Sequence, residues 1–511
     1  MSLYSRSIVA TGHHLVSKAA ATVLEGGGNA FDAAVAAGFA GAVVEPCLTS
    51  LGGGGFLLAR TCGNRQPAQE IFFDFFVDTP GRGLHEIPEP HFFPVTVAFG
   101  GSDQDFNIGL GSVAVPGTLK GLLHVHNRLG YMDLRDVIQP ALSLAKGHIL
   151  NDFQSTFMQL LYPILTLSET GKRLYEPKGT YLKEGDTLVN VELAGFLEQV
   201  AEEQGRSFYE GEIAQAIARD MREGEGLLTL KDLAAYKVIE RKPLQIRYRE
   251  YTLLTSPPPS FGGTLIALSL ALHQQVEQQH SFGSNQHLLQ TTAIMQEVER
   301  LREQGWVTPR QLEQLMDSAQ LKQAARTVRL FSRGTTHVSI ADRDGNVASM
   351  TCSNGEGAGY FAPGSGIMLN NMMGEDDLHP DGFHAGPPGE RVGSMMSPSL
   401  LLDAEGAVRL VMGSGGSKRI RTAIIQVLTQ VIDHNRELQQ AVEAPRLYWD
   451  GELLQVEPGF AADVIEAVSK RVRVNCWEEQ SVYFGGVHTV VPGKTGVGDP
   501  RRGGAAIVVE E

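Results

Sequence analysis

The sequence predicts a protein of the α+β class, because helical patterns dominate its first two thirds and strand patterns its last third. Residues 105–245 have a mainly helical pattern, including 117–129, 134–145 and 190–203, and helices are expected to continue to Val328. From Thr335 onward, short strands with alternating polar and apolar residues are separated by glycine turns and end in a strand over 505–510. This change of pattern places a boundary near residue 334.

The first 60 residues predict a strand, two helices and a second strand. A helix over 17–24 ends at three glycines, and an Ala-rich helix over 29–40 follows. The glycine run 52–55 leads into a strand over 56–60. This run lacks the Lys-Ser/Thr of a phosphate-binding loop, so close backbone packing is the favoured interpretation. Further along, a proline-rich turn over 256–263 separates a strand over 251–255 from a helix over 264–274.

Composition limits the classes of function. At about 100–200 residues per domain, 511 residues predict two to four units. A net charge of −15 argues against a nucleic-acid partner, which needs clustered Lys and Arg, and leaves a small-molecule substrate open. The sequence has no uninterrupted run of about 18 apolar residues, so no membrane span is predicted. The polar start, residues 1–7, has no secretory pattern, so a cytoplasmic location is expected, or a periplasmic or secreted one if a signal has been removed. Four scattered cysteines have no metal-ligand spacing.

Residues 334–353 carry the pattern of a β-hairpin. Alternating residues from Thr335 lead to an Asp-Arg-Asp-Gly-Asn turn, after which the alternation resumes over 347–351. Facing residues in an antiparallel hairpin have a constant index sum. A sum of 688 places Thr335 opposite Ser353, and a sum of 689 places it opposite Asn354. A threonine facing a serine is by itself usually a cross-strand hydrogen bond, so the hairpin alone is weak evidence for catalysis.

The segment Gly-Thr-Thr-His-Val-Ser-Ile-Ala-Asp, residues 334–342, closely resembles the processing site of the γ-glutamyltranspeptidases, a branch of the N-terminal nucleophile hydrolases. Other blocks resemble the same family in the same order, so the resemblance covers nearly the whole chain. These blocks are 27–34, 52–56, 115–117, 257–263, 366–371, 394–398, 413–420 and 499–501. The resemblance implies a four-layer αββα sandwich.

The resemblance further implies a proenzyme that cuts itself between Gly334 and Thr335. Its products would be a helix-rich large chain, 1–334, and a small chain, 335–511, which share the sandwich. The hydroxyl of Thr335 would be the nucleophile and its newly freed α-amine the base. An α-amine with a pKa of ~7.7–8.0 has a usable neutral fraction near neutral pH. The substrate would be a small-molecule amide, and water or an amine would release the acyl-enzyme without a cofactor or metal.

Other site residues follow from the same resemblance. Ser353 stands where the family has a threonine that hydrogen-bonds the catalytic residue. Gly415, Gly416 and Ser417 resemble the loop whose backbone N–H groups form the oxyanion hole. Without Thr335 nearby, that loop would be interpreted as a plain glycine turn.

The segments that hold the substrate in this family are altered. Phe76 occupies the position of the arginine that binds the α-carboxylate of a glutamyl group. The serine pair that assists it is reduced to Ser394 followed by Met395. The segment around Asn354 is about two residues shorter than the family pattern.

Some groups could still bind the polar ends of a substrate. Glu375, or Asp376 with a small shift, could meet an ammonium group. Arg391, Lys418 and Arg419 are the cations that could replace the lost arginine.

Three functions are therefore compared. The leading one is an N-terminal-threonine amide hydrolase or acyl transferase acting on γ-glutamyl or related small acyl amides. A second is an amidohydrolase on the same scaffold for a non-glutamyl amide, resembling cephalosporin acylases or oxamate-type amide hydrolases. The third is an uncleaved, inactive binding or scaffold protein, against which the intact Gly334–Thr335 junction argues.

Overall fold

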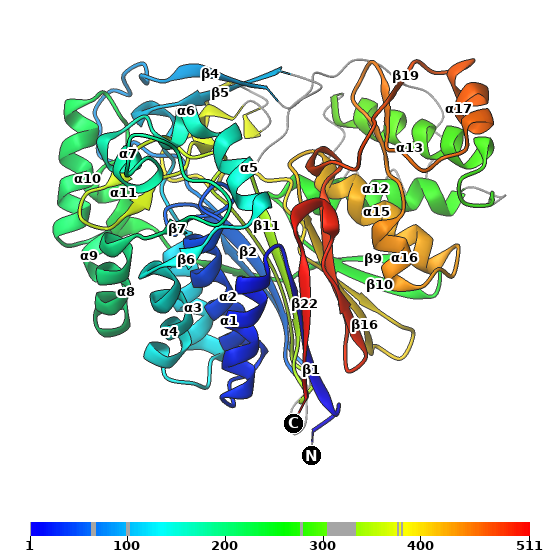
Figure 1. Ribbon diagram of the computed structural model, residues 1–511, viewed down its shortest axis with the longest axis horizontal. Helices are drawn as coiled ribbons and strands as arrows, with labels where there is room; N and C mark the ends of the chain where they lie inside the picture. Colours follow the sequence, from blue (N-terminus) through cyan, green and yellow to red (C-terminus); the bar gives the residue numbers. More distant parts are fainter. Residues whose placement is uncertain are drawn as a thin grey trace.

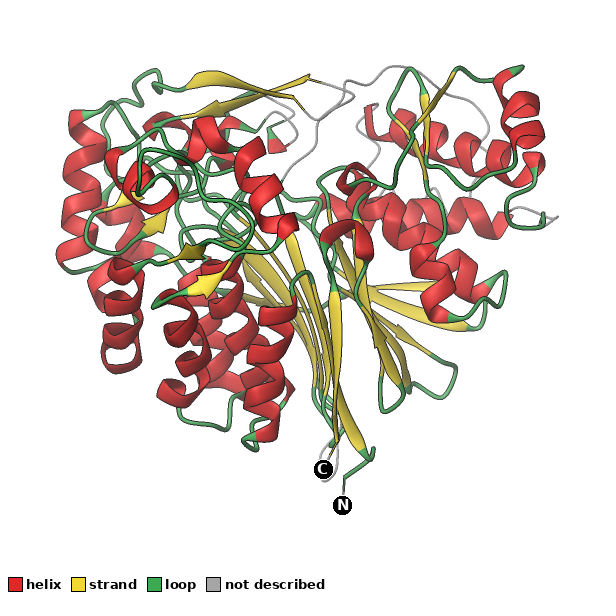
Figure 2. Ribbon diagram, viewed as in Figure 1, coloured by secondary structure: helices red, strands yellow, loops and turns green. Residues whose placement is uncertain are grey.

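Two antiparallel sheets packed face to face form the centre of the molecule, with helices on both outer sides (Figures 1 and 2). The computed structural model describes residues 2–62, 68–98, 103–275, 280–303, 334–375, 378–379 and 382–510. The larger sheet consists, in order, of β22 (Ala505–Glu510), β1 (Arg6–Thr11), β11 (Thr336–Ala341), β12 (Val347–Ser353), β2 (Gly54–Arg60), β3 (Glu70–Phe75) and β8 (Ile239–Arg241). The smaller sheet consists of β21 (Thr495–Val497), β20 (Gly486–Val491), β16 (Val408–Gly415), β15 (Ser399–Leu402), β10 (Tyr251–Thr255) and β9 (Leu244–Tyr248).

The helices complete four αββα layers, as the resemblance implies. The larger sheet is covered by α1 (His14–Glu25), α2 (Ala30–Val44) and α3 (Thr118–Leu129), with α4 (Leu134–Ala145) packed on α2, and the smaller sheet by α12 (Phe261–Gln275) and α15 (Arg419–Ile432). Peripheral helices are α5 (Asp152–Leu160), α6 (Tyr162–Leu165), α7 (Glu169–Tyr175), α8 (Val191–Glu203), α9 (Arg206–Tyr209), α10 (Glu212–Glu223), α11 (Leu230–Ala235), α13 (Asn285–Glu303), α16 (Leu438–Glu443) and α17 (Ala462–Ser469). Short outer strands are β4 (Phe93–Ala98), β5 (Asp103–Ile108), β6 (His148–Ile149), β7 (Thr187–Leu188), β13 (Phe361–Ala362), β14 (Ile367–Met368), β17 (Leu447–Trp449), β18 (Leu454–Val456) and β19 (Val474–Cys476).

Helix α2 illustrates how local sequence sets an element. The Asn29 side chain accepts from the backbone N–H of Asp32, and the Asp32 side chain accepts from that of Asn29, which satisfies two donors at the helix start. Every residue of α2 is buried, because its small side chains allow neighbouring helices to approach closely. A Cβ on Gly38 would lie 2.5 Å from a methyl group of Leu122 in α3.

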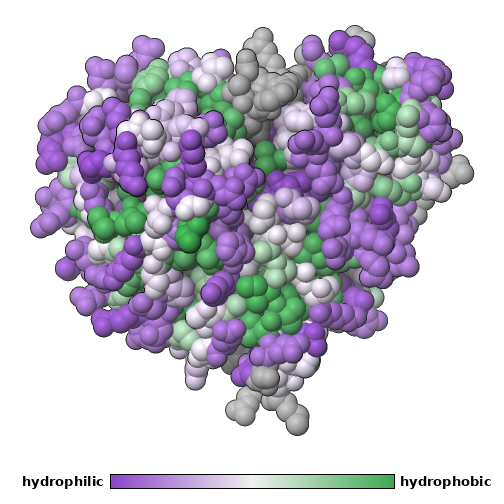
Figure 3. Space-filling model, in the orientation of Figure 1, coloured by the Kyte–Doolittle hydropathy of each residue, from purple (hydrophilic) through white to green (hydrophobic). Residues whose placement is uncertain are grey.

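The central strands β11 and β12 are buried along their whole length. One hydrophobic core lies between the larger sheet and helices α1–α4, and another lies between the two sheets and under α12 and α15. The face of the molecule seen in Figure 3, in contrast, is largely hydrophilic, with smaller hydrophobic patches. The hairpin singled out in the sequence is therefore fixed from both sides.

Most predicted elements agree with the structure to within a few residues, including the first two helices and the strands at 56–60, 251–255 and 505–510. The strands predicted after Thr335 are present, but the prediction omitted three α-helices in the described residues of this part, of which α15 follows the loop at 413–417. This helix is needed to bury the outer face of the smaller sheet. The predicted helical continuation from residue 304 to 328 lies outside the described residues.

Candidate active site

The hairpin of β11 and β12 brings Thr335 and Ser353 together. Thr336 pairs with Cys352, an index sum of 688, so Thr335 stands opposite Ser353 rather than Asn354. Thr335 Oγ1 lies 3.3 Å from Ser353 Oγ, and both residues are buried. The first of the two predicted registers is confirmed.

Both hydroxyls point to the carbonyl of the bond predicted to break. Thr335 Oγ1 donates to the Gly334 oxygen at 2.7 Å, and Ser353 Oγ donates to the same oxygen at 2.6 Å. The backbone N–H of Gly355 donates to Ser353 Oγ at 3.1 Å, and that of Gly334 donates to Glu356 Oε1 at 3.1 Å. These contacts orient Ser353 and place the Thr335 hydroxyl beside the carbonyl that it would attack.

The junction has little free space. A Cβ on Gly334 would lie 2.4 Å from the carbonyl oxygen of Cys47 and 2.5 Å from that of Gly355. Real Cβ atoms do not approach backbone oxygens so closely, so the position requires glycine. The chain at 47 and the chain at 355 thus hold Gly334 from two sides.

The glycine loop after β16 lies against Thr335. Gly415 pairs with Gly486 at the end of β16, and a Cβ on Gly415 would lie 2.2 Å from the Thr335 carbonyl oxygen. Gly416 and Ser417 have φ values of 120° and 51°, which turn the chain into α15. The loop therefore lies where backbone N–H groups could stabilise negative charge at the nucleophile. Its role as the oxyanion hole stays a prediction.

The variant Gly415→Ala tests this packing. The added methyl group would force the loop away from Thr335, and we expect self-cleavage and amidase activity to fall at least about 10²-fold, comparable to losing one oxyanion donor. Densitometry of a processing time course and a kcat measurement would test this. Gly195→Ala is the matched control, because a Cβ at Gly195 in α8 meets nothing within 4 Å. Normal processing and turnover of Gly415→Ala would contradict the close packing.

Two of the predicted substrate-binding residues lie next to the junction. The side chain of Asn354 is fully buried, and neither its nitrogen nor its oxygen has a hydrogen-bond partner within the described ranges. Such an unpaired buried amide costs about 1–3 kcal/mol, a cost that a bound ligand can remove. Glu375 lies close by, because a Cβ on Gly355 would be 2.5 Å from its Oε1. Both side chains therefore gather around residue 355.

Other predicted substrate residues are not placed at the nucleophile. Ser394 accepts hydrogen bonds on its carbonyl oxygen from the N–H groups of Phe261 and Gly262, and its Oγ accepts from the N–H of Met396. It is thus part of the packing of the proline-rich turn, and its described hydrogen bonds do not reach Thr335. Asp376 lies outside the described residues.

Phe76 and Arg391 lie close together in the fold. Phe76 belongs to one of the segments that differ from the family pattern. The Phe76 ring is 1% exposed and lies 5.5 Å from the ring of Phe56 between the sheets. Arg391 Nε is 2.9 Å from a carboxylate oxygen of Asp78, and its Nη1 is 3.2 Å from one of Asp74. Burial nevertheless raises the pKa of Asp78 to about 6, against the lowering effect of Arg391. Because two carboxylates already face Arg391, it does not replace the missing arginine.

The other two candidate cations begin α15. Lys418 is the N-cap residue and is mostly buried. Arg419 Nε donates to the Tyr483 carbonyl oxygen at 2.7 Å, and the guanidinium lies 4.5 Å above the Tyr483 ring. Its Nη1 and Nη2 have no hydrogen-bond partner in the part of the chain that the structure describes. Both terminal nitrogens of the Arg419 guanidinium are therefore available to a ligand.

Sequence reasoning missed two charged residues beside Thr335 and Thr336. Arg502 Nη1 donates to the Thr335 carbonyl oxygen at 2.9 Å, and Thr336 Oγ1 donates to the carboxylate of Glu45. A signal for Glu45 did exist, because it is a charged residue directly after the entirely apolar end of α2. Arg502 follows the family block at 499–501 and had no separate signal.

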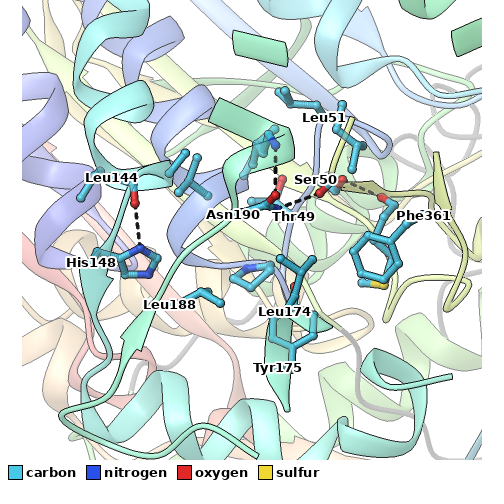
Figure 4. Close-up of a pocket in the computed structure, with 18 residues that line it drawn as sticks. Thr49, Ser50, Leu51, Leu144, His148, Leu174, Tyr175, Leu188, Asn190 and Phe361 are labelled. Carbon is cyan, nitrogen blue, oxygen red and sulfur yellow. Dashed lines mark hydrogen bonds between the residues drawn. The ribbon is translucent and has the colours of Figure 1, made fainter. Parts of the chain in front are cut away.

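A small cavity is lined in part by Pro46, Thr49 and Ser50, which neighbour Cys47 in the sequence (Figure 4). Its volume is about 20 Å³, and Ser50, His148, Tyr175 and Phe361 are among the residues that line it. His148 Nδ1 is already 3.2 Å from the Leu144 carbonyl oxygen. A space of this size holds about one water molecule, so it is not a substrate site.

Neither a metal-binding cluster nor a membrane-spanning helix is found among the described residues. Over those ranges, no three His, Cys, Asp or Glu side chains are grouped so that they could hold a metal ion. Likewise, no helix in the described part of the chain is long and apolar enough to cross a membrane.

A four-layer αββα sandwich with a buried threonine at the start of a central strand is the arrangement of the N-terminal nucleophile hydrolases. The sequence model of the family described as "Gamma-glutamyltranspeptidase" matches residues 16–509 of this chain. The chain belongs to the γ-glutamyltranspeptidase family and is a self-processing hydrolase or acyl transferase.

Individual proteins give the same result. The chain is 32% identical over 491 residues to the glutathione hydrolase proenzyme of Escherichia coli, covering 88% of this chain and 82% of that protein. It is 33% identical over 490 residues to the acylase ACY 1 proenzyme of a Pseudomonas species, covering 91% and 87%. The crystal structure of cephalosporin acylase from Bacillus halodurans has the same fold, with a TM-score of 0.84, 24% identity and coverage of 99% and 96%. Proenzyme relatives imply that this chain is processed into two chains.

Proposed function

We propose that Thr335 is the nucleophile of this enzyme and that self-cleavage between Gly334 and Thr335 produces chains 1–334 and 335–511. The observation that carries the proposal is that Thr335 Oγ1 and Ser353 Oγ both donate to the Gly334 carbonyl oxygen. Attack of the hydroxyl on this carbonyl, with breakage of the Gly334–Thr335 C–N bond, would move the acyl group from nitrogen to Oγ1 and free the α-amine of Thr335. Hydrolysis of the resulting ester would then release the Gly334 carboxylate and restore the Thr335 hydroxyl.

The freed α-amine then serves as the base for the next reaction. It takes the proton of the Thr335 hydroxyl as that oxygen attacks the carbonyl of an amide substrate. Gly415, Gly416 and Ser417 stabilise the oxyanion. The amine of the substrate then leaves with the proton that the α-amine of Thr335 had taken up. Water or an amine acceptor then attacks the acyl-enzyme, so hydrolysis and transfer share one intermediate.

The substrate we propose is a small acyl amide, with Asn354 and Glu375 contacting its polar groups. Two relatives, one named a glutathione hydrolase and one named an acylase, are almost equally similar to this chain. Phe76 in place of the arginine favours acyl groups that lack a free α-carboxylate. A non-glutamyl, acylase-like amide is therefore the second candidate, and the loss at Phe76 is the observation that supports it.

Self-cleavage is the direct test. Purified protein is expected to separate on a denaturing gel into two chains, of 334 and 511 − 334 = 177 residues. Edman sequencing of the smaller chain should read Thr-Thr-His-Val-Ser. A single intact chain with full amidase activity would defeat the proposal.

A further inference from the structure

The first two residues of the nucleophile strand are held by charged groups from opposite ends of the sequence. Thr336 Oγ1 donates to Glu45 Oε2 at 3.0 Å and lies 3.2 Å from Oε1. Arg502 Nη1 donates to the Thr335 carbonyl oxygen at 2.9 Å. Glu45 is the C-cap residue of α2, and Arg502 ends the short helix η6 (Pro500–Arg502). After the proposed cleavage, Glu45 belongs to the large chain and Arg502 to the small one.

The packing leaves these two groups little freedom. Glu45 is 5% exposed and Arg502 is 2% exposed. A Cβ on Gly12 would lie 2.8 Å from Glu45 Oε1 and 2.9 Å from Thr336 Oγ1, and a Cβ on Gly415 would lie 3.0 Å from Arg502 Nη1. Away from bulk water, a charge acts more strongly on its neighbours than it would at the surface.

Among the described residues, Glu45 has three titratable neighbours, namely Arg502 from η6, His488 from β20 and Cys352 from β12. Burial lowers the pKa of His488 to about 4 and raises the pKa of Cys352 to about 12, so both are neutral near pH 7. Burial also raises the pKa of Glu45 to about 7, opposed by the Thr336 hydrogen bond and by Arg502. Glu45 therefore becomes negative as the pH rises through neutrality.

Arg502 remains a cation over the same range. Burial and then the neighbouring Arg419 lower its pKa to about 10, while Asp499 and Glu45 act in the opposite direction and Arg446 adds to the lowering. Asp499 is already paired with Arg446 and Arg501. Arg502 thus presents a positive charge to the carbonyl of the residue whose amine must lose a proton.

We propose that Glu45 and Arg502 are positioning residues that hold Thr335 from the two chains and set, in opposite directions, the pH range in which its α-amine acts as the base. The inference rests on the proposed function of Thr335. A cation next to an ammonium group disfavours the protonated amine, so Arg502 extends activity to lower pH. The negative Glu45 stabilises the ammonium form and has the opposite effect.

The test is the pH dependence of kcat/KM for an acyl anilide, measured on the mature two-chain enzyme. The acid limb of this profile is the pH range over which kcat/KM rises as the α-amine loses its proton. Arg502→Gln should move the acid limb to higher pH by about 0.5–1 unit, and Glu45→Gln should move it to lower pH by about the same amount. Arg502→Lys retains the charge and should keep the wild-type limb. The double variant Glu45→Gln/Arg502→Gln should return towards the wild-type position, because the two effects oppose each other.

Matched exposed residues provide the controls. Glu405→Gln and Arg471→Gln remove the same charges from the surface and should leave the limb unchanged. A merely structural role would lower the thermal unfolding midpoint and kcat without moving the limb, and that result would overturn the proposal. So would shifts of both single variants in the same direction. If Glu45→Gln does not fold, the comparison of Arg502→Gln with Arg502→Lys tests the proposal. An acid limb that stays in place in Arg502→Gln would then overturn the proposal.

Failure of the proposed function would look different. If Thr335 were not the nucleophile, Thr335→Ala would still be cleaved and active whatever the pH limb does.

Discussion

Thr335→Ala is expected to remain one chain of 511 residues and to lose roughly 10⁴–10⁶-fold in amidase activity. The substitution removes the hydroxyl that lies 2.7 Å from the Gly334 oxygen, and without cleavage the α-amine is never released. Nucleophile and base are therefore lost together. A denaturing gel reports the processing, and product formation at high enzyme concentration reports the residual rate.

Conservative and control variants sharpen this result. Thr335→Ser keeps the hydroxyl and should be processed slowly and retain part of the activity. Thr495→Ala changes an exposed threonine of the small chain and should be processed normally. If Thr335→Ala is cleaved at the same bond at the normal rate, the assignment of the nucleophile is wrong.

The second large effect concerns the substrate. We expect the enzyme to be a poor γ-glutamyl hydrolase, because the resemblance implies that Phe76 stands where the family has the arginine that binds the α-carboxylate. Leaving a buried charge unpaired costs ~3–5 kcal/mol. At ~1.36 kcal/mol per factor of ten, kcat/KM should fall about 10²–10⁴-fold. The measurement compares a γ-glutamyl anilide with acyl anilides that lack the α-carboxylate.

Phe76→Arg should reduce this difference by restoring the cation, whereas Phe76→Met changes the same buried position without adding charge and should not. The ratio of the two kcat/KM values is the informative quantity, because a general loss of folding lowers both. Efficient γ-glutamyl turnover by the unmodified enzyme would show that other groups bind the carboxylate. Arg419 is then the first residue to substitute, because its Nη1 and Nη2 lack partners among the described residues.

Local patterns in the sequence were sufficient for most elements near the site. The glycines after α1, the cap at Asn29 and the turn after Ala341 act within a few residues, so they can be interpreted without the fold. Helix α15 was missed although it provides the outer layer over the smaller sheet. The glycines of the loop at 413–417 are typical of a turn, and they directly precede this helix.

The sequence by itself narrowed the residue opposite Thr335 to Ser353 or Asn354, because an antiparallel hairpin has only a few possible registers. The tertiary structure selected the register that places Thr335 opposite Ser353. The resemblance also pointed to the glycine loop and to Glu375, and the fold places both near the junction. Their chemical roles stay predictions that the variants above test.

Only the tertiary structure decided which charged groups contact Thr335 and Thr336. Glu45 and Thr336 are 291 residues apart in the sequence, and Arg502 and Thr335 are 167 apart. No local pattern encodes such contacts, because they arise where helix α2, strand β11 and helix η6 meet. The same holds for Arg391, a candidate from the sequence that the fold commits to Asp74 and Asp78. A charged residue can be recognised in a sequence, but the tertiary packing determines which residue it contacts.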